Sequence, residues 1–317
     1  MPFQPILDLG HGITRIESGM VHDELAACYL VQGGEEYALV ETGTQHTVPR
    51  ILALLAMRNI RPEQVKYVIP THVHLDHAGG AGGLMRELPE AVLLAHPLGA
   101  RHLIEPAKLK TGAMAVYGEA TFARIYGDIV PVEAARVRSM PDGSEVLLGD
   151  RRLVFLDTPG HARHHFCVFD PVSNGVFTGD TFGLAYPALA TALGPFIFPT
   201  TTPVQFDPEA MKRSIARLLA LKPERMFLTH YGMVESPQTL GEALLNQVDE
   251  MAALALAVRD EAGPKEREAL LLQRLTGYLF DRVRAHGCTL PDARLHDLLD
   301  TDLRLNAQGL GVWLGQE

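Results

Sequence analysis

Three histidines and one aspartate fall close together in the stretch THVHLDH, which covers residues 71–77. Residues two apart on an extended or tightly turned loop point the same way, so His72 and His74 can hold one ion together. Asp76 and His77 then reach a neighbouring point a short distance away. Imidazole and carboxylate ligands suit Zn, Fe, Mn or Co better than copper(I) or calcium. The stretch therefore predicts a transition-metal site.

Three further polar residues follow apolar runs, and each lies next to or close to a glycine. His161 follows FLDTPG, Asp180 follows GVFTG, and His230 follows MFLT. A single histidine in such a setting is more often structural. Repetition of the same arrangement after several strands favours one shared site, because functional side chains are commonly carried on loops of a rigid scaffold.

The elements that must position these residues are strands that end in loops. An apolar strand over residues 65–70 leads into the first motif, after an amphipathic helix over residues 48–60. A helix pattern covers residues 208–221, and β-like runs cover residues 145–148, 153–156, 166–169, 175–178 and 226–229. This alternation predicts an α/β (α+β) body over residues 1–235.

The sequence pattern changes in residues 236–317, where apolar residues recur at helical spacing and Gly263-Pro264 interrupts the pattern. The pattern predicts helices over about residues 240–261, 265–285 and 291–299. We expect this helical extension to act as a lid over the substrate, as a stabilising cap or as a contact in a homodimer. Helical amphipathicity alone does not distinguish these roles.

Composition narrows the class of protein. The 317 residues carry a net charge of −10 with no Lys/Arg cluster, which argues against a nucleic-acid partner. The only cysteines are Cys28, Cys167 and Cys288, too far apart for a thiolate zinc site or a disulfide framework. No signal peptide and no apolar run of about 20 residues is present, so we expect a cytoplasmic protein without a membrane partner.

The motifs THVHLDH, TPGH, TGD and LTH together resemble the metallo-β-lactamase superfamily, in its glyoxalase II-like and lactonase-like branch, over about the first 235 residues. The resemblance implies a four-layer αββα sandwich with the metals at one edge. It also implies two divalent transition-metal ions, with zinc expected first and iron or manganese as alternatives. The implied ligands are His72, His74 and His161 for one ion, Asp76, His77 and His230 for the other, and Asp180 as a bridge.

The chemistry implied is that of a dinuclear metal-dependent hydrolase acting on a small ester, thioester, lactone or related bond. Two ions lower the pKa of a shared water to about 7, which gives a hydroxide nucleophile. Asp76 could also orient that hydroxide as a catalytic residue. The alternatives are an iron-dependent redox or oxygen enzyme of the same superfamily (persulfide dioxygenase-like or diiron), a phosphodiesterase, or a retired enzyme that serves a partner.

The residues that contact the small-molecule substrate are harder to assign. Tyr231 could donate to an oxyanion, and His165 could contact the substrate, although packing roles are as consistent with the sequence. Lactonases of this superfamily often place a tyrosine three residues after the bridging aspartate, and this chain has Gly183 there. The extension also lacks a basic-plus-tyrosine arrangement for a glutathione carboxylate.

Overall fold

The computed structural model describes residues 4–315, apart from the side chains of residues 116, 117, 264 and 265. The chain divides into two compact units. Unit 1 comprises residues 1–157, 164–179 and 223–235, and unit 2 comprises residues 158–163, 180–222 and 236–317. The chain therefore passes from one unit to the other several times before its C-terminal helices.

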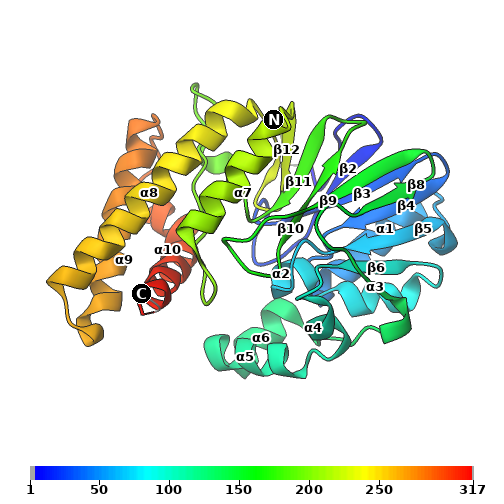
Figure 1. The fold of residues 1–317 in the computed structure, drawn as a ribbon, viewed down its shortest axis with the longest axis horizontal. Helices are drawn as coiled ribbons and strands as arrows, with labels where there is room; N and C mark the ends of the chain where they lie inside the picture. Colours follow the sequence, from blue (N-terminus) through cyan, green and yellow to red (C-terminus); the bar gives the residue numbers. More distant parts are fainter. Residues whose placement is uncertain (1–3, 316–317) are drawn as a thin grey trace. The chain divides into compact units, whose positions relative to one another are not determined.

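A seven-stranded mixed sheet forms one half of unit 1, and its spatial order follows the chain order (Figure 1). Neighbours are antiparallel from β1 to β4 and parallel from β4 to β7. The strands are β1 (Ile6–Asp8), β2 (Ile13–Glu17), β3 (Ala27–Gly33), β4 (Glu36–Val40), β5 (Val65–Ile69), β6 (Val92–Ala95) and β7 (Val137–Ser139). The parallel half carries the first metal motif directly after β5.

The second sheet of unit 1 has six strands in the order β13-β12-β11-β10-β9-β8, and only the β11–β12 pair is parallel. The strands are β8 (Glu145–Leu148), β9 (Arg151–Asp157), β10 (Phe166–Asp170), β11 (Gly175–Gly179), β12 (Arg225–Leu228) and β13 (Gly232–Glu235). The sequence pattern missed β13, because Gly232 and the exposed Glu235 leave only two apolar residues in it.

The two sheets of unit 1 pack against each other through aromatic side chains. The ring of Tyr29 on β3 lies edge-on to Phe177 and Phe227 of the second sheet, with centroids 5.3 and 5.7 Å away. The Tyr29 hydroxyl donates to the backbone oxygen of Leu228. A buried tyrosine whose hydroxyl is satisfied contributes a large apolar area without an unpaired polar group.

A buried ion pair also ties the strands of unit 1 together. Arg151 on β9 donates from Nε to Asp170 Oδ1 at 2.9 Å and from Nη2 to the other carboxylate oxygen, and both side chains are almost fully buried. Arg151 Nη1 donates to the backbone oxygens of His11 and Gln32, at 2.6 and 2.8 Å. The guanidinium thus joins three segments of unit 1 that are distant in sequence.

The helices of unit 1 follow the parallel strands. They are α1 (Val48–Met57), α2 (Leu75–Ala78), α3 (Ala81–Glu87), α4 (Ala100–Ile104), α5 (Ala107–Tyr117) and α6 (Glu119–Tyr126). Ile51 and Leu54 of α1 and Leu84 of α3 share a buried core with Leu39 and Val68 of the first sheet. The helix predicted to start at Val48 ends at Met57, three residues earlier than its apolar pattern suggested.

Unit 2 is mainly helical, with α7 (Pro208–Ala220), α8 (Pro237–Glu261), α9 (Pro264–Ala285) and α10 (Asp292–Leu314). In Figure 1 these are the yellow-green to red helices. The last helix is longer than predicted, because buried Leu303, Ala307, Leu310 and Leu314 continue its helical spacing beyond Leu299.

The predicted α/β class is confirmed, with two mixed sheets and C-terminal helices. None of the helices in the described part of the chain is long and apolar enough to cross a bilayer. Cys28, Cys167 and Cys288 are all buried, and none of them forms a disulfide bond.

Candidate metal centre

The first motif lies between β5 and α2, where a parallel strand ends. His72 and His74 are on the loop, and Asp76 and His77 are on the short helix α2. His72 Nε2 and His74 Nδ1 are 2.8 Å apart, so two ring nitrogens face one point. The His72 and His77 rings are also adjacent, with centroids 4.0 Å apart. The motif therefore folds into one compact group of nitrogen and oxygen donors.

Asp76, His77 and His230 form a complete three-donor group inside unit 1. The Nε2 atoms of His77 and His230 lie 3.4 and 3.3 Å from Asp76 Oδ2. Two ligands bound at 2.0–2.2 Å to one tetrahedral zinc ion lie roughly 3.3–3.5 Å from each other, so these separations suit a shared ion. His230 reaches the group from the end of β12, more than 150 residues along the chain.

The outer ring nitrogens of both histidines are held by acceptors. His77 Nδ1 lies 2.9 Å from Glu41 Oε1, and His230 Nδ1 lies 2.7 Å from the backbone oxygen of Leu25. A carboxylate or carbonyl can only accept, so each Nδ1 carries the proton and each Nε2 keeps its lone pair for an ion. Such outer contacts fix the tautomer and orientation of metal ligands. The residues present therefore fit a divalent metal ion.

The charge of Asp76 depends on the two neighbouring imidazoles. Burial opposes ionisation of Asp76, but His77 and His230 in their protonated form outweigh burial and hold the pKa of that carboxyl well below its usual range. Asp76 is consequently an anionic acceptor at neutral pH, as a metal ligand or a partner for an attacking water must be.

Glu41 is a buried carboxylate that the sequence analysis did not single out. It lies just after β4 and accepts from the backbone N–H and hydroxyl of Thr71, at 3.1 and 2.6 Å. It also accepts from the Thr229 hydroxyl at 2.9 Å, in addition to His77. Thr71 precedes His72, and Thr229 precedes His230, so one carboxylate contacts both of the loops that carry these predicted ligands. The threonine directly before each of the two histidines was the available signal in the sequence.

His161 and Asp180 both belong to unit 2. His161 Nε2 lies 3.2 Å from Asp180 Oδ2, and both side chains are buried. The His161 loop needs Gly160, which has φ +136° and whose Cβ would lie 2.3 Å from Met211 Cα. The Thr181 hydroxyl donates to the backbone oxygen of Thr158 at 3.2 Å and so ties the two ligand loops together.

The two predicted substrate contacts are buried in unit 1. His165 is fully buried, with its ring centroid 4.9 Å from that of His72. Tyr231 is 3% exposed and lies under the Arg15 guanidinium, 4.6 Å from its ring centroid, and burial raises the Tyr231 pKa. Their contact with substrate stays a prediction. The neighbouring His164 is buried as well, and both histidines directly precede β10.

Gly183 bears on the lactonase question. Its φ is +70°, and a Cβ there would lie 2.4 Å from the backbone oxygen of Phe198 and 2.8 Å from Leu244 Cδ2. Any side chain at this position is therefore excluded unless the backbone of unit 2 moves. The departure from the lactonase pattern at residue 183 is built into the fold.

Comparison with known proteins places the chain in a family. The sequence profile of the metallo-beta-lactamase superfamily matches residues 23–230. A metallo-beta-lactamase fold-containing protein of Sulfurisphaera tokodaii is 28% identical over 74% of this chain and 83% of its own length. Its crystal structure matches with a TM-score of 0.62 over 75% of this chain and 86% of that chain.

Two further relatives extend the comparison. The human acyl-coenzyme A thioesterase MBLAC2 is 26% identical over 54% of this chain and 64% of its own length. A metallo-beta-lactamase family protein of Thermus thermophilus shares the fold over 98% of this chain and 95% of that chain, at 22% identity and a TM-score of 0.67. The chain belongs to the metallo-beta-lactamase superfamily.

Proposed function

We propose that this chain is a dinuclear metal-dependent hydrolase that cleaves a small thioester or related ester. The observation that carries the proposal is the group of Asp76, His77 and His230, whose donor atoms are spaced for one ion and whose outer nitrogens are anchored. The relationship to an acyl-coenzyme A thioesterase and the closed position at Gly183 favour thioesters over lactones.

We assign the predicted ligands to two ions. Asp76, His77 and His230 would hold one, and His72, His74 and His161 would hold the other, as the motifs of this superfamily imply. Asp180 would be a ligand that the two ions share. The order of the motifs along a chain of this superfamily supports that assignment, as does the 3.2 Å separation of His161 and Asp180 within unit 2.

Two divalent transition-metal ions, zinc by preference, would supply an activated water nucleophile at neutral pH. The Asp76 carboxylate would accept a hydrogen bond from that water and orient it for attack. Glu41 keeps both histidines' loops in place through Thr71 and Thr229. No side-chain nucleophile is required.

Measurement of bound metal tests the assignment directly. Purified wild-type protein should hold close to two transition-metal ions per chain, whereas His72→Ala and Asp180→Ala should each lose metal. His22→Ala changes an exposed histidine and should leave metal content unaltered. Less than one ion per chain in the wild type, or unchanged content in both variants, contradicts the proposal.

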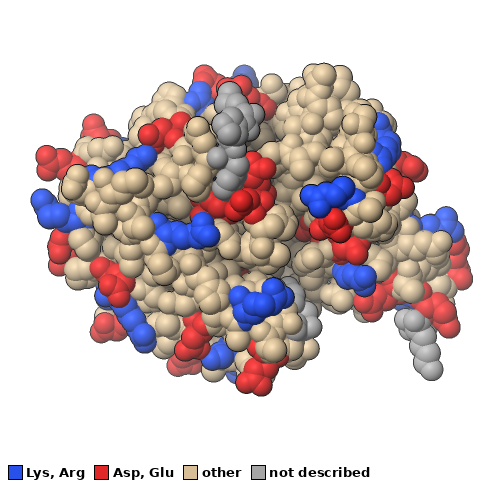
Figure 2. Space-filling view, turned by 180° about the vertical axis from the view of Figure 1, so that it is seen from behind, with Lys and Arg blue, Asp and Glu red and all other residues tan. Residues whose placement is uncertain are grey.

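A substrate panel then separates the alternatives. Thioesters should be hydrolysed faster than lactones and phosphodiesters, and protein from iron-replete cells should be colourless if zinc is the working metal. A coloured iron protein without esterase activity would support the redox alternative instead. On the face shown in Figure 2, acidic and basic side chains are interspersed, which gives no support to a polynucleotide substrate there.

Three predictions from the sequence belong to this proposal. We propose residues 1–235 as the catalytic domain and residues 236–317 as the helical extension. We also propose a cytoplasmic location, with which three buried cysteines that form no disulfide bond are consistent. A homodimer is to be tested by the molar mass in solution.

A further inference from the structure

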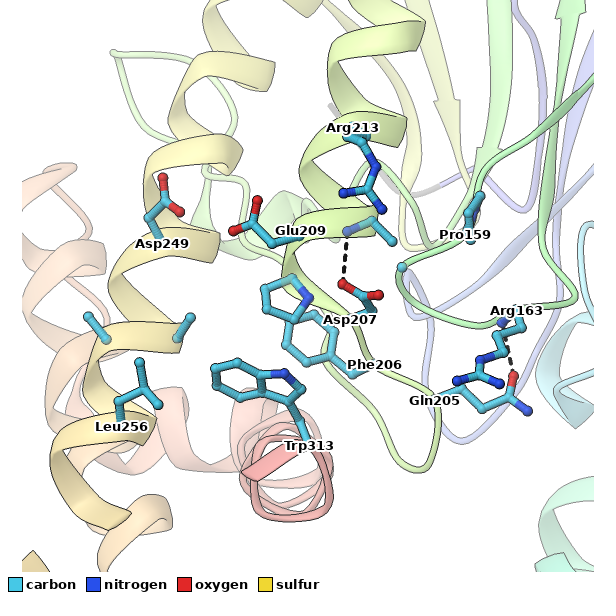
Figure 3. A pocket seen from close by; sticks show the side chains of 15 residues that line it. Pro159, Arg163, Gln205, Phe206, Asp207, Glu209, Arg213, Asp249, Leu256 and Trp313 are labelled. Carbon is cyan, nitrogen blue, oxygen red and sulfur yellow. Dashed lines mark hydrogen bonds between the residues drawn. The ribbon is translucent and has the colours of Figure 1, made fainter. Parts of the chain in front are cut away.

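A groove of about 760 Å³ lies within unit 2 and has no role in the metal site described above (Figure 3). It is formed where the first turns of α7 meet the middle of α8 and the end of α10. The loop residues Pro159 and Gly160 complete it, and Gly160 directly precedes the proposed ligand His161. Its volume is within the roughly 300–1,000 Å³ of small-molecule sites.

The carboxylates that line the groove are already engaged. Asp207 caps α7 and accepts from Ala210 N at 2.9 Å. Glu209 and Asp249 both pair with Lys212, at 2.8 and 2.6 Å. Asp207 is therefore used as a helix cap, and Glu209 and Asp249 share one ammonium at the surface.

Two arginines provide the remaining positive charge. Arg163 and Arg213 both line the groove and are exposed. Within the part of the chain that the structure describes, neither guanidinium has an ion-pair partner. Guanidinium groups bind phosphate oxygens in a bidentate manner and are weakly hydrated, so they suit phosphate recognition. The groove therefore presents cations suited to a phosphorylated ligand.

An aromatic platform lies next to these cations. Trp313 is half-buried, and its ring centroid lies 6.3 Å from that of the buried Phe206 in an edge-on arrangement. Figure 3 shows both rings below the first turn of α7, with Arg213 projecting from the same helix above them. An indole fixed by an edge-on neighbour presents a face on which a planar heterocycle can stack.

We propose that this groove binds the phosphorylated adenosine end of a coenzyme A thioester, with the adenine on Trp313 and the phosphates at Arg213 and Arg163. The inference rests on the proposed hydrolase function and names its substrate class. A coenzyme A thioester has its reactive bond far from its nucleotide, and Gly160, which lines the groove, directly precedes His161. In the reaction water adds to the thioester carbonyl, the C–S bond breaks, and the thiol leaves with a proton while the acyl group becomes a carboxylic acid.

The only tryptophan of the chain is Trp313, so its fluorescence reports on the groove alone. Adenosine 3′,5′-bisphosphate added to the full-length protein should change that fluorescence saturably, with matching heat by calorimetry, in metal-loaded and metal-free protein alike. Arg213→Ala should weaken binding about tenfold, the typical effect of losing a charged hydrogen bond. Arg304→Ala removes an exposed arginine of α10 outside the groove and should bind like the wild type.

The groove assignment is overturned if millimolar nucleotide gives neither a saturable fluorescence change nor heat, or if Arg213→Ala and Arg304→Ala bind equally well. Catalysis supplies a separate readout. Arg213→Ala should raise KM about tenfold for an acyl-coenzyme A but leave KM unchanged for an N-acetylcysteamine thioester, which lacks the nucleotide. Hydrolysis of both thioesters without nucleotide binding would refute the groove alone, whereas nucleotide binding without any hydrolysis would refute the proposed function.

Discussion

Replacement of Glu41 by glutamine tests whether one buried carboxylate holds in place the two loops that carry His72 and His230. Glu41 accepts four hydrogen bonds, three at Oε1 and one at Oε2. The best amide orientation keeps the oxygen at the Oε1 position and turns the NH₂ group toward the Thr71 N–H, so two donors face each other. One charge-assisted bond is lost and three become neutral.

The expected cost follows from those bonds. A hydrogen bond to a charged group contributes about 1.5–3 kcal/mol, so Glu41→Gln should lower the free energy of unfolding by about 2–4 kcal/mol. The His77 imidazole also loses its anionic partner, and loss of such a contact reduces metal affinity about 10–100-fold. Both effects come from the same substitution but are measured independently.

Urea unfolding of metal-free protein gives the first quantity, and competition with a chromophoric chelator gives the second. Glu35→Gln makes the same chemical change at an exposed site in the β3–β4 turn and should alter neither. Ordinary surface substitutions change the free energy of unfolding by no more than about 0.5 kcal/mol. If Glu41→Gln changes it by no more than that, the hydrogen-bond reasoning is wrong. If it destabilises the fold but binds metal normally, the proposed hold on His77 is wrong.

Three further substitutions test other parts of the structure. Asp170→Asn should cost about 3–5 kcal/mol in urea unfolding, because it leaves the buried Arg151 guanidinium without a carboxylate; a cost below 1 kcal/mol would contradict that. Gly160→Ala should lower metal content, measured by elemental analysis, because its Cβ would collide with α7 and displace the His161 loop; full metal content would show that the loop tolerates a side chain. Hydrogen bonds from Arg58 and Thr14 hold the pKa of the Asp8 carboxyl below its ordinary value. The stability that the ionised Asp8 contributes to the folded protein is therefore fully present above about pH 4, and it is lost as the pH falls through the lowered pKa of the folded state. The difference in free energy of unfolding between wild type and Asp8→Asn should accordingly shrink on acidification. A difference that grows would contradict a lowered pKa for Asp8.

The parts of this protein that sequence patterns could predict are local. His72, His74, Asp76 and His77 share one short stretch after an apolar strand, so residue type and spacing were sufficient to nominate them. The boundaries of β5 were predicted to within one residue, because the buried Val65, Val68 and Ile69 mark the two ends of the strand. Their role as ligands stays a proposal until metal is measured.

The parts that could not be predicted depend on tertiary contacts. Glu41 is one of many acidic residues in the sequence, and only the fold brings it to Thr71 and Thr229. The burial of both His164 and His165 departs from strand alternation because they precede β10 rather than lie in it. The groove beside Trp313 combines segments from four regions of the chain, which no sequence spacing could connect.

The interleaving of the two units has a consequence for engineering. The C-terminal helices share unit 2 with residues 158–163 and 180–222, the segments that carry His161 and Asp180. The helical extension is therefore not a separate compact unit that could be removed on its own. A truncation after residue 235 would remove the partners with which two proposed ligands fold, and a helical extension grafted from another hydrolase would have to be compatible with those two loops as well as with its own helices.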